Sequence, residues 1–276
     1  MSSVNLPPIF EYLRLDRRFP HILCPGCGIG TVMNAMVRAF LELKLDKNKL
    51  CVVSGIGCSS RIPGYLDCDT YHTLHGRALP AATGVKLARP EMEVVVIGGD
   101  GDILAIGGNH FLHSCRRNLN LSLIIINNFN YGMTGGQFSP TTPFNAIATT
   151  APYGNIEREF DVVAIAKAAG AVLVARSTTY HVVHLKNMIK RIIQKKGFSV
   201  LEVIAQCPTL YGRMNRLGDA VKMLEWIKEN TVSVTETNPP KADTKKKIKI
   251  GVLWETEAEE YLEVYQRTIK RASEQK

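Results

Sequence analysis

The sequence predicts a doubly wound α/β fold, with a mostly parallel sheet between two layers of helices. The chain of 276 residues is long enough for one large domain and an appendage. It contains several short, almost continuously apolar runs, as expected for strands that are covered on both faces. Segments with helical spacing alternate with these runs, a pattern typical of a doubly wound sheet.

The predicted elements follow one another at a regular pitch. The strands are predicted at Leu50–Ser54, Glu93–Ile97, Leu121–Ile126, Val172–Ala175 and Ser199–Ile204. The helices are predicted at Thr31–Lys44, Asn109–Arg117, Val162–Ala169 and His181–Gln194, where apolar residues recur on one helical face.

The chain changes character after Cys207. We predict a domain over residues 1–210 and a C-terminal helical extension, partly mobile, over residues 211–276. In the extension, Asp219–Asn230 has the pattern of an amphipathic helix, and Ser233–Lys249 is polar and contains prolines, as mobile connectors do. Val252–Ser273 alternates charged and apolar residues, which fits a surface helix or an arm that binds a partner.

The composition is that of a soluble globular protein, with 45% apolar and 21% charged residues. No run approaches the roughly 18 apolar residues of a membrane span. The N-terminal residues 1–20 lack the apolar core of a secretory signal. We therefore expect a cytoplasmic protein, in which the seven cysteines do not form a disulfide framework.

The formal net charge is +9, which could attract nucleic acid, an anionic cofactor or an acidic protein. Proteins that bind single strands interleave aromatic and basic residues on one face, and the sequence has no such pattern. We therefore expect no nucleic-acid binding, while an acidic electron-transfer partner is compatible with the charge.

The most informative stretch begins where the second predicted strand ends, in Gly98-Gly99-Asp100-Gly101-Asp102. The next strand ends in Asn127-Asn128. Because ligands of open α/β sheets lie beyond the carboxyl ends of the strands, Asp100 and Asn128 should face one crevice. Mg²⁺ prefers such oxygen ligands together with phosphate oxygens, and glycines allow the backbone to approach the phosphates.

Two rival motifs fail on this sequence. A dinucleotide fingerprint G-x-G-x-x-G that begins at Gly99 would require its last glycine at position 104, which is Leu104. The fingerprint also fails when it is aligned to begin at Gly28 or Gly55. The chain also lacks the G-x-x-x-x-G-K-[ST] phosphate loop. The competing interpretation is that the glycines form only an ordinary turn.

Four cysteines lie in glycine- or proline-rich loops: Cys24 and Cys27 in CPGCG, Cys58 in GIGCSS and Cys207 in AQCP. Cys58 follows the first predicted strand and Cys207 the last, which is the edge of the proposed diphosphate site. Four converging thiolates suit an iron–sulfur cluster or a structural zinc ion, and the spacing leaves both open. Cys51 and Cys115 fit buried apolar positions, and Cys68 is ambiguous.

GDG followed about two dozen residues later by NN resembles the motif of thiamine diphosphate enzymes. The resemblance implies that Asp100 and Asn128 bind Mg²⁺ through their side chains and Asn130 through its carbonyl. It implies diphosphate contacts from Gly101, Asp102, Gly132 and Met133. These enzymes also use a glutamate from a second domain, for which the chain has no room. An α subunit should therefore supply the pyrimidine side, at a subunit interface.

Five segments together, CPGCG, GIGCSSRIPGYL, HTLHGRALPAATGVKLA, GDGD and NNFNYGMTGGQFSPTTP, resemble the β subunit of 2-oxoacid:ferredoxin oxidoreductases over about residues 20–215. The resemblance implies that Cys24, Cys27, Cys58 and Cys207 bind a 4Fe–4S cluster. It also implies that Ile56, Gly57, Cys58, Ser59 and His75 line the thiamine diphosphate.

The resemblance further implies CoA-dependent oxidative decarboxylation of a 2-oxoacid, with electrons passed through the cluster to ferredoxin and further small subunits as partners. Overall likeness favours 2-oxoglutarate, which gives succinyl-CoA and CO₂, over a branched-chain oxoacid or pyruvate. Gly135 stands where broad-specificity relatives can carry lysine, and its small size leaves space. Arg61, Arg77 or the partner subunit could supply a cation for the second carboxylate. The chain could instead be a subunit of a non-redox thiamine decarboxylase, or a zinc-stabilised binding subunit.

Overall fold

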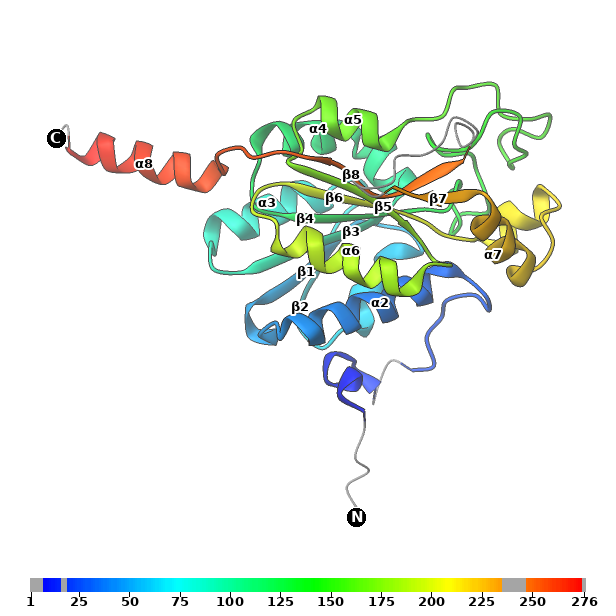
Figure 1. The fold of residues 1–276 in the computed structure, drawn as a ribbon, viewed down its shortest axis with the longest axis horizontal. Helices are drawn as coiled ribbons and strands as arrows, with labels where there is room; N and C mark the ends of the chain where they lie inside the picture. Colours follow the sequence, from blue (N-terminus) through cyan, green and yellow to red (C-terminus); the bar gives the residue numbers. More distant parts are fainter. Residues whose placement is uncertain (1–6, 16–18, 235–246, 275–276) are drawn as a thin grey trace, which may run out of the picture.

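An eight-stranded sheet forms the centre of the computed structural model, which describes residues 7–15, 19–234 and 247–274 (Figure 1). The strand order is β2-β1-β3-β4-β6-β5-β8-β7. The strands in chain order are β1 (Leu50–Ser54), β2 (Asp69–His72), β3 (Glu93–Gly99), β4 (Ser122–Asn127), β5 (Leu173–Thr178), β6 (Ser199–Ile204), β7 (Thr231–Ser233) and β8 (Ile248–Glu255). The first six run parallel, so the carboxyl ends of β1, β3 and β4 meet at one edge.

Helices cover both faces of the sheet, and each layer encloses its own apolar core (Figure 1). One face carries η1 (Pro8–Tyr12), α2 (Gly28–Leu43), η3 (Ser59–Tyr65) and α6 (Val182–Gln194). The other face carries α3 (Ala78–Ala88), α4 (Gly108–Arg117) and α5 (Val162–Ala168). The remaining helical segments are η2 (Lys47–Lys49), η4 (Gly101–Ile106), η5 (Pro208–Gly212), α7 (Ala220–Glu229) and α8 (Tyr261–Glu274).

All five predicted strands and the helices predicted before residue 231 are confirmed, because continuous apolar runs and amphipathic spacing are strong local signals. Before residue 231, one strand longer than three residues and one α-helix were not predicted. The edge strand β2 is short and largely exposed, so it has no apolar pattern. Helix α3 contains Pro80 and Gly84, which weaken the helical signal although a proline in the first turn is tolerated.

The C-terminal segment contributes strands to the sheet, and the surface helix predicted within Val252–Ser273 is confirmed only from Tyr261 onward. Residues 248–255 form β8, which pairs antiparallel with β5, and the helix begins only at Tyr261. Trp254 Nε1 donates to the Ala171 carbonyl at 3.1 Å. Of the predicted connector Ser233–Lys249, residues 235–246 lie outside the described residues.

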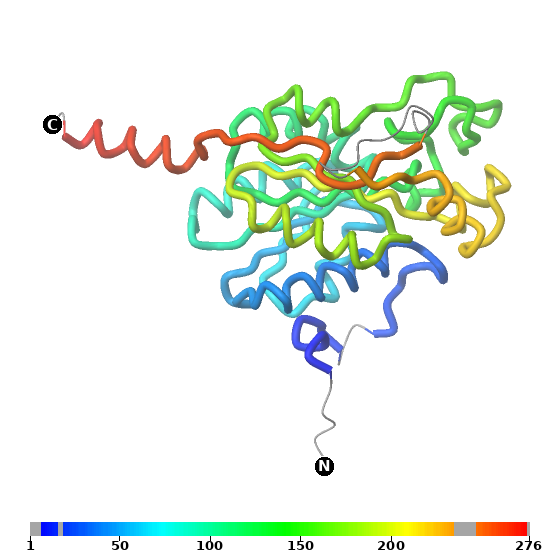
Figure 2. Tube along the Cα trace, in the orientation of Figure 1, coloured from blue at the N-terminus to red at the C-terminus, as the bar shows by residue number. Residues whose placement is uncertain are grey.

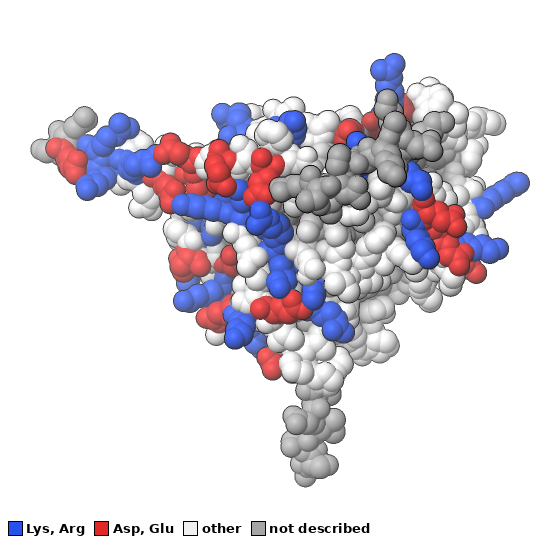
Figure 3. Space-filling view, in the orientation of Figure 1, with Lys and Arg blue, Asp and Glu red and all other residues white. Residues whose placement is uncertain are grey.

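Helix α8 extends away from the sheet (Figure 2), and charged side chains of both signs lie between it and α6 (Figure 3). Lys190 pairs with Glu42 at 2.9 Å, and Arg191 pairs with Glu255 at 2.8 Å. Several basic side chains on this face are therefore paired with acidic ones. Among the described residues, no helix is long and apolar enough to cross a bilayer.

Candidate active site

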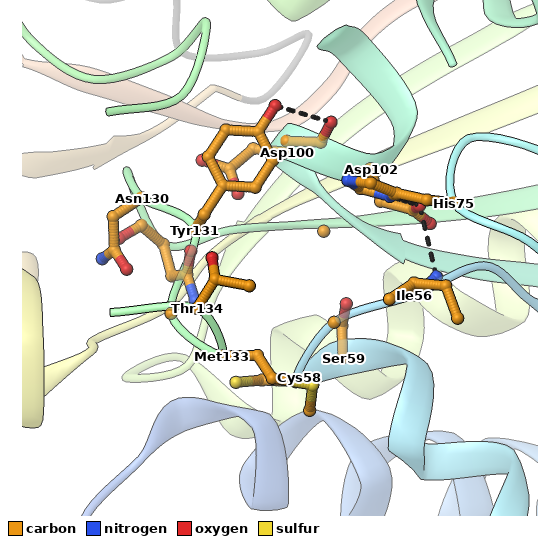
Figure 4. Close-up of a pocket in the computed structure, with 15 residues that line it drawn as sticks. Ile56, Cys58, Ser59, His75, Asp100, Asp102, Asn130, Tyr131, Met133 and Thr134 are labelled. Atoms are coloured by element: carbon orange, nitrogen blue, oxygen red, sulfur yellow. Dashed lines mark hydrogen bonds and ion pairs between the residues drawn. The ribbon is translucent and has the colours of Figure 1, made fainter. Parts of the chain in front are cut away.

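A pocket opens at the carboxyl ends of β1, β3 and β4 (Figure 4). Every residue that the sequence assigned to the diphosphate or to Mg²⁺ lines it: Ile56, Gly57, Cys58, Ser59, His75, Asp100, Gly101, Asp102, Asn128, Asn130, Gly132 and Met133. Gly99, Tyr131 and Thr134 line it as well. The structure thus brings these residues together, and their binding roles stay predictions.

Asp100, which directly follows β3, is buried with one carboxylate oxygen already bonded. Its Oδ2 accepts hydrogen bonds from Ser139 Oγ at 2.6 Å and from Thr141 Oγ1 at 2.7 Å. Burial raises the pKa of Asp100 to about 6, and the two hydroxyls oppose this rise because they stabilise the carboxylate. Oδ1 remains available to a cation.

The Asn128 amide lies between Asp100 Oδ1 and the Asn130 carbonyl oxygen. In one orientation its oxygen faces these two acceptors, and in the other its nitrogen donates to both, at 3.2 and 2.8 Å. The first orientation gathers three oxygen acceptors with no hydrogen between them, an arrangement that a cation stabilises. Adjacent ligands of octahedral Mg²⁺ lie about 3 Å apart, because each bond is about 2.1 Å long. The donor set therefore fits Mg²⁺.

A strained turn joins two of these oxygen donors. Phe129 has a φ of +62°, a left-handed conformation that is rare for a bulky residue. Asn127 Oδ1 accepts its N–H at 3.2 Å, and Thr142 Oγ1 donates to its carbonyl at 2.7 Å. The turn places the Asn128 side chain and the Asn130 backbone on the same side.

Asp102 connects the loops that follow β1 and β2. Its buried Oδ1 accepts the N–H groups of Gly76 at 2.7 Å and Ile56 at 3.2 Å, and it contacts His75 Nδ1 (Figure 4). Only Nε2 of His75 could then bond a ligand oxygen. A Cβ at Gly55 would lie 2.1 Å from Asp102 Oδ2, so the close approach of these loops requires glycine.

The four predicted cluster cysteines come from three loops at the same edge of the sheet. Cys24 is exposed, Cys27 and Cys58 are half-buried, and Cys207 is buried. Burial, with smaller contributions from the nearby thiols of Cys207, Cys58 and Cys24, raises the pKa of the Cys27 thiol to about 12. The four are thus electrostatic neighbours. In the part of the chain that the structure describes, no group of three or more His, Cys, Asp or Glu side chains could hold a metal ion as placed, so cluster binding stays a prediction.

Gln206 ties the CPGCG loop to the end of β6. The side-chain Nε2 of Gln206 donates to the Gly26 carbonyl at 3.0 Å, and Thr179 Oγ1 donates to the side-chain Oε1 at 2.6 Å. The backbone carbonyl of Gln206 accepts the Gly28 N–H at 3.1 Å. The two N-terminal cysteines are thereby held beside Cys207.

Sequence reasoning missed the residues that support the site. Ser139 and Thr141 lie in a long loop without helical or strand periodicity, and Tyr131 donates to the Gly101 carbonyl at 3.2 Å. The hydroxyl-rich SPTTP segment, close after the paired asparagines, was the available signal.

Comparison with known proteins agrees with this geometry. Residues 55–203 match the family described as thiamine pyrophosphate enzyme, C-terminal TPP binding domain. The match covers more than half of the chain and includes all the residues of the pocket. The fold and the site therefore define a thiamine pyrophosphate-binding domain.

Individual relatives narrow this class. The chain is 50% identical over 265 residues to the 2-oxoglutarate synthase subunit KorB of Methanocaldococcus jannaschii, with 96% of this chain and 98% of that protein covered. It is 44% identical over 186 residues to the 2-oxoacid:ferredoxin oxidoreductase 2, subunit beta, of Aeropyrum pernix, with 67% and 60% covered.

A solved structure is also similar over nearly the whole chain. This is the 2-oxoglutarate:ferredoxin oxidoreductase from Magnetococcus marinus with 2-oxoglutarate, coenzyme A and succinyl-CoA bound. The TM-score is 0.87 and the identity 31%, with 99% of this chain and 93% of that chain covered. The chain belongs to the family of 2-oxoacid:ferredoxin oxidoreductase β subunits, which confirms the resemblance and the fold class, and it is a subunit of an oxidoreductase.

Proposed function

We propose that the chain is the thiamine diphosphate-binding subunit of an enzyme that oxidises 2-oxoglutarate. The products are succinyl-CoA, CO₂ and reduced ferredoxin, and the other reactants are coenzyme A and oxidised ferredoxin. The observation that carries the proposal is the shared pocket, where the oxygen donors of Asp100, Asn128 and Asn130 lie with the thiol of Cys58. The similarity to proteins named for 2-oxoglutarate supports the choice of substrate.

In this proposal the chain holds Mg²⁺ and the diphosphate. Asp100 Oδ1, the Asn128 amide oxygen and the Asn130 carbonyl bind Mg²⁺, while Ser139 and Thr141 keep Asp100 Oδ2 bonded. Backbone N–H groups at Gly101, Asp102, Gly132 and Met133 donate to the phosphates. The carboxylate of Asp102 faces the loops instead, which keeps a second negative charge away from the diphosphate. The bound cofactor supplies the electron sink for decarboxylation.

Cys24, Cys27, Cys58 and Cys207 hold the 4Fe–4S cluster. The proposal is supported by the mutual proximity of the thiols and by Cys58, which lines the cofactor pocket. Cys207 Sγ also lies 4.0 Å from Asn130 Oδ1, so the cysteine group adjoins the proposed magnesium residues. A cluster held by these cysteines would adjoin the cofactor pocket at Cys58 and could accept electrons there.

A partner α subunit covers the mouth of the pocket and supplies the pyrimidine side of the site. Ile56 and Met133, which line the pocket, are exposed by 39% and 49%, and Leu74, which precedes His75, and Ile106, which lies against Gly76, are exposed by 75% and 59%. Exposed apolar patches of this kind mark protein interfaces. Arg61 and Arg77 do not line the pocket, and Arg77 contacts His110, so we assign the cation for the second substrate carboxylate to the partner.

We expect Mg²⁺-dependent binding of thiamine diphosphate to weaken in acid. Burial raises the pKa of Asp100 to about 6, and only the deprotonated carboxylate binds Mg²⁺. The apparent Mg²⁺ affinity should be constant above about pH 7 and fall up to tenfold per pH unit below about pH 6. Titration calorimetry on the complex from about pH 5 to 8 measures this, with the melting temperature at each pH as control. An affinity that does not change with pH would contradict the expectation.

The substrate is tested with the complex purified anaerobically together with its partner chain. We expect CoA-dependent reduction of ferredoxin or a viologen dye, with a kcat/KM for 2-oxoglutarate at least about tenfold above those for pyruvate and a branched-chain oxoacid, a difference of about 1.4 kcal/mol. Reduction no faster than with buffer would exclude 2-oxoglutarate. CO₂ release without dye reduction would indicate a non-redox decarboxylase, and zinc in place of iron would indicate a binding subunit.

A further inference from the structure

A buried carboxylate, Glu202, lies in the middle of the sheet between β4 and β5. Its Oε2 accepts a hydrogen bond from Arg176 Nε at 2.7 Å, and its Oε1 accepts one from Asn127 Nδ2 at 2.8 Å. Arg176 and Glu202 are register partners on β5 and β6, so strand pairing itself brings the ion pair together. The arginine balances the charge of a carboxylate that would otherwise be strongly destabilising in the core.

The other side of Asn127 contacts the supports of the proposed magnesium donors. Asn127 Oδ1 lies 2.9 Å from Thr141 Oγ1, which in turn lies 2.7 Å from Asp100 Oδ2. The same Oδ1 accepts the N–H of Phe129 at 3.2 Å, in the left-handed turn that carries the other two oxygen donors. One amide thus connects the support of Asp100 with that turn.

The charge of Glu202 determines which way this amide faces. An ionised carboxylate only accepts hydrogen bonds, so Asn127 must present its NH₂ group to Glu202 and its oxygen to the N–H of Phe129. With glutamine at position 202, Arg176 still requires an acceptor oxygen, so the glutamine NH₂ group would face Asn127 and favour the reversed orientation of its amide. In the reversed orientation, the NH₂ group of Asn127 would face the N–H of Phe129, donor against donor.

Glu202 acts at a distance from the cofactor pocket. Asn127, Thr141, Arg176 and Glu202 line a different cavity, of about 700 Å³, and none of the four lines the pocket of Figure 4. The hydrogen bond with Asn127 is the side-chain contact through which Glu202 can affect the cofactor site.

We propose that Glu202 is a positioning residue for the magnesium–diphosphate site, and that it acts by fixing the orientation of Asn127. The proposal rests on the proposed function, because it requires that Asp100, Asn128 and Asn130 bind Mg²⁺. Arg176 has a supporting role, since its guanidinium pairs with the Glu202 carboxylate at 2.7 Å and holds it in place.

The test compares Glu202→Gln, Asn127→Ala and the double variant in the intact complex. Titration calorimetry measures the Mg²⁺ concentration that half-saturates thiamine diphosphate binding. We expect each single variant to raise it about tenfold or more, and the double variant to resemble Asn127→Ala, because residues that act in series are not additive. At saturating Mg²⁺, kcat of Glu202→Gln should return to within about twofold of the wild-type value, which general structural damage would not allow.

Glu93→Gln is the matched control, since it changes a largely buried carboxylate on β3 at the end remote from the pocket. It should leave the Mg²⁺ requirement unchanged.

Additive effects of the two single variants, or a Glu202→Gln complex with the wild-type Mg²⁺ requirement, would overturn the proposal. If Glu202→Gln does not assemble, Arg176→Lys is tested in its place. We expect this variant to raise the half-saturating Mg²⁺ concentration by a smaller factor. If it leaves that concentration unchanged, the proposal is overturned. A wild-type complex that binds no thiamine diphosphate with Mg²⁺ overturns the proposed function as well.

Discussion

Asp100→Asn is expected to weaken Mg²⁺-dependent binding of thiamine diphosphate by at least about 100-fold. Asp100 is the anionic member of a donor set whose other members are an amide and a carbonyl oxygen. Loss of about 3 kcal/mol of attraction between carboxylate and cation corresponds to roughly this factor. Asparagine keeps the shape of the side chain and can still accept from Ser139 and Thr141, so the fold should persist. Titration calorimetry measures the Mg²⁺-dependent binding of thiamine diphosphate, and ferredoxin reduction by the same preparation measures the activity.

Glu93→Gln again serves as the control for Asp100→Asn, because it removes a carboxylate from β3, the strand that Asp100 directly follows, outside the pocket. It should bind the cofactor as the wild type does. If Asp100→Asn bound thiamine diphosphate at the wild-type Mg²⁺ concentration, the magnesium assignment would be wrong.

Cys27→Ser is expected to remove the iron–sulfur cluster and to lower ferredoxin reduction by at least about 100-fold. Serine lacks the thiolate that these clusters require. Cys27→Ser should not destabilise the start of α2, because Cys27 is the N-cap of this helix and serine is a preferred N-cap residue. Cys27 does not line the cofactor pocket, so thiamine diphosphate binding should change little. Iron and acid-labile sulfide, measured anaerobically per complex, report the cluster.

Cys68→Ser is the comparison for this variant, since Cys68 is a half-buried free cysteine outside the proposed set of four. It should keep full iron and sulfide. Equal iron content in Cys27→Ser and the wild type, or zinc in place of iron in both, would contradict the cluster assignment.

The parts of the fold that could be predicted are those with strong local signals. β1 and β6 have the predicted bounds because each is an almost continuous apolar run that is buried on both faces. The pocket could be predicted for a topological reason: parallel neighbouring strands end at one edge, so Asp100 and Asn128 had to face the same crevice.

The parts that could not be predicted depend on contacts between residues far apart in the chain. The hydrogen bond between Asn127 and Glu202 spans 75 residues, and no local pattern shows that a glutamate within an apolar strand faces an asparagine. The same holds for β8, whose pairing with β5 joins Glu255 to Leu173. Ser139 and Thr141 depend on the path of a loop that has no periodicity.

The antiparallel pairing of β8 with β5 also limits where the chain can be shortened. A protein that ends near residue 210 would keep the pocket residues and all four proposed cluster cysteines. It would also leave β5 as an open edge, with unpaired N–H and C=O groups beside a buried apolar strand. Such edges recruit strands from other molecules, so the shortened protein should be prone to aggregation even with its catalytic residues intact.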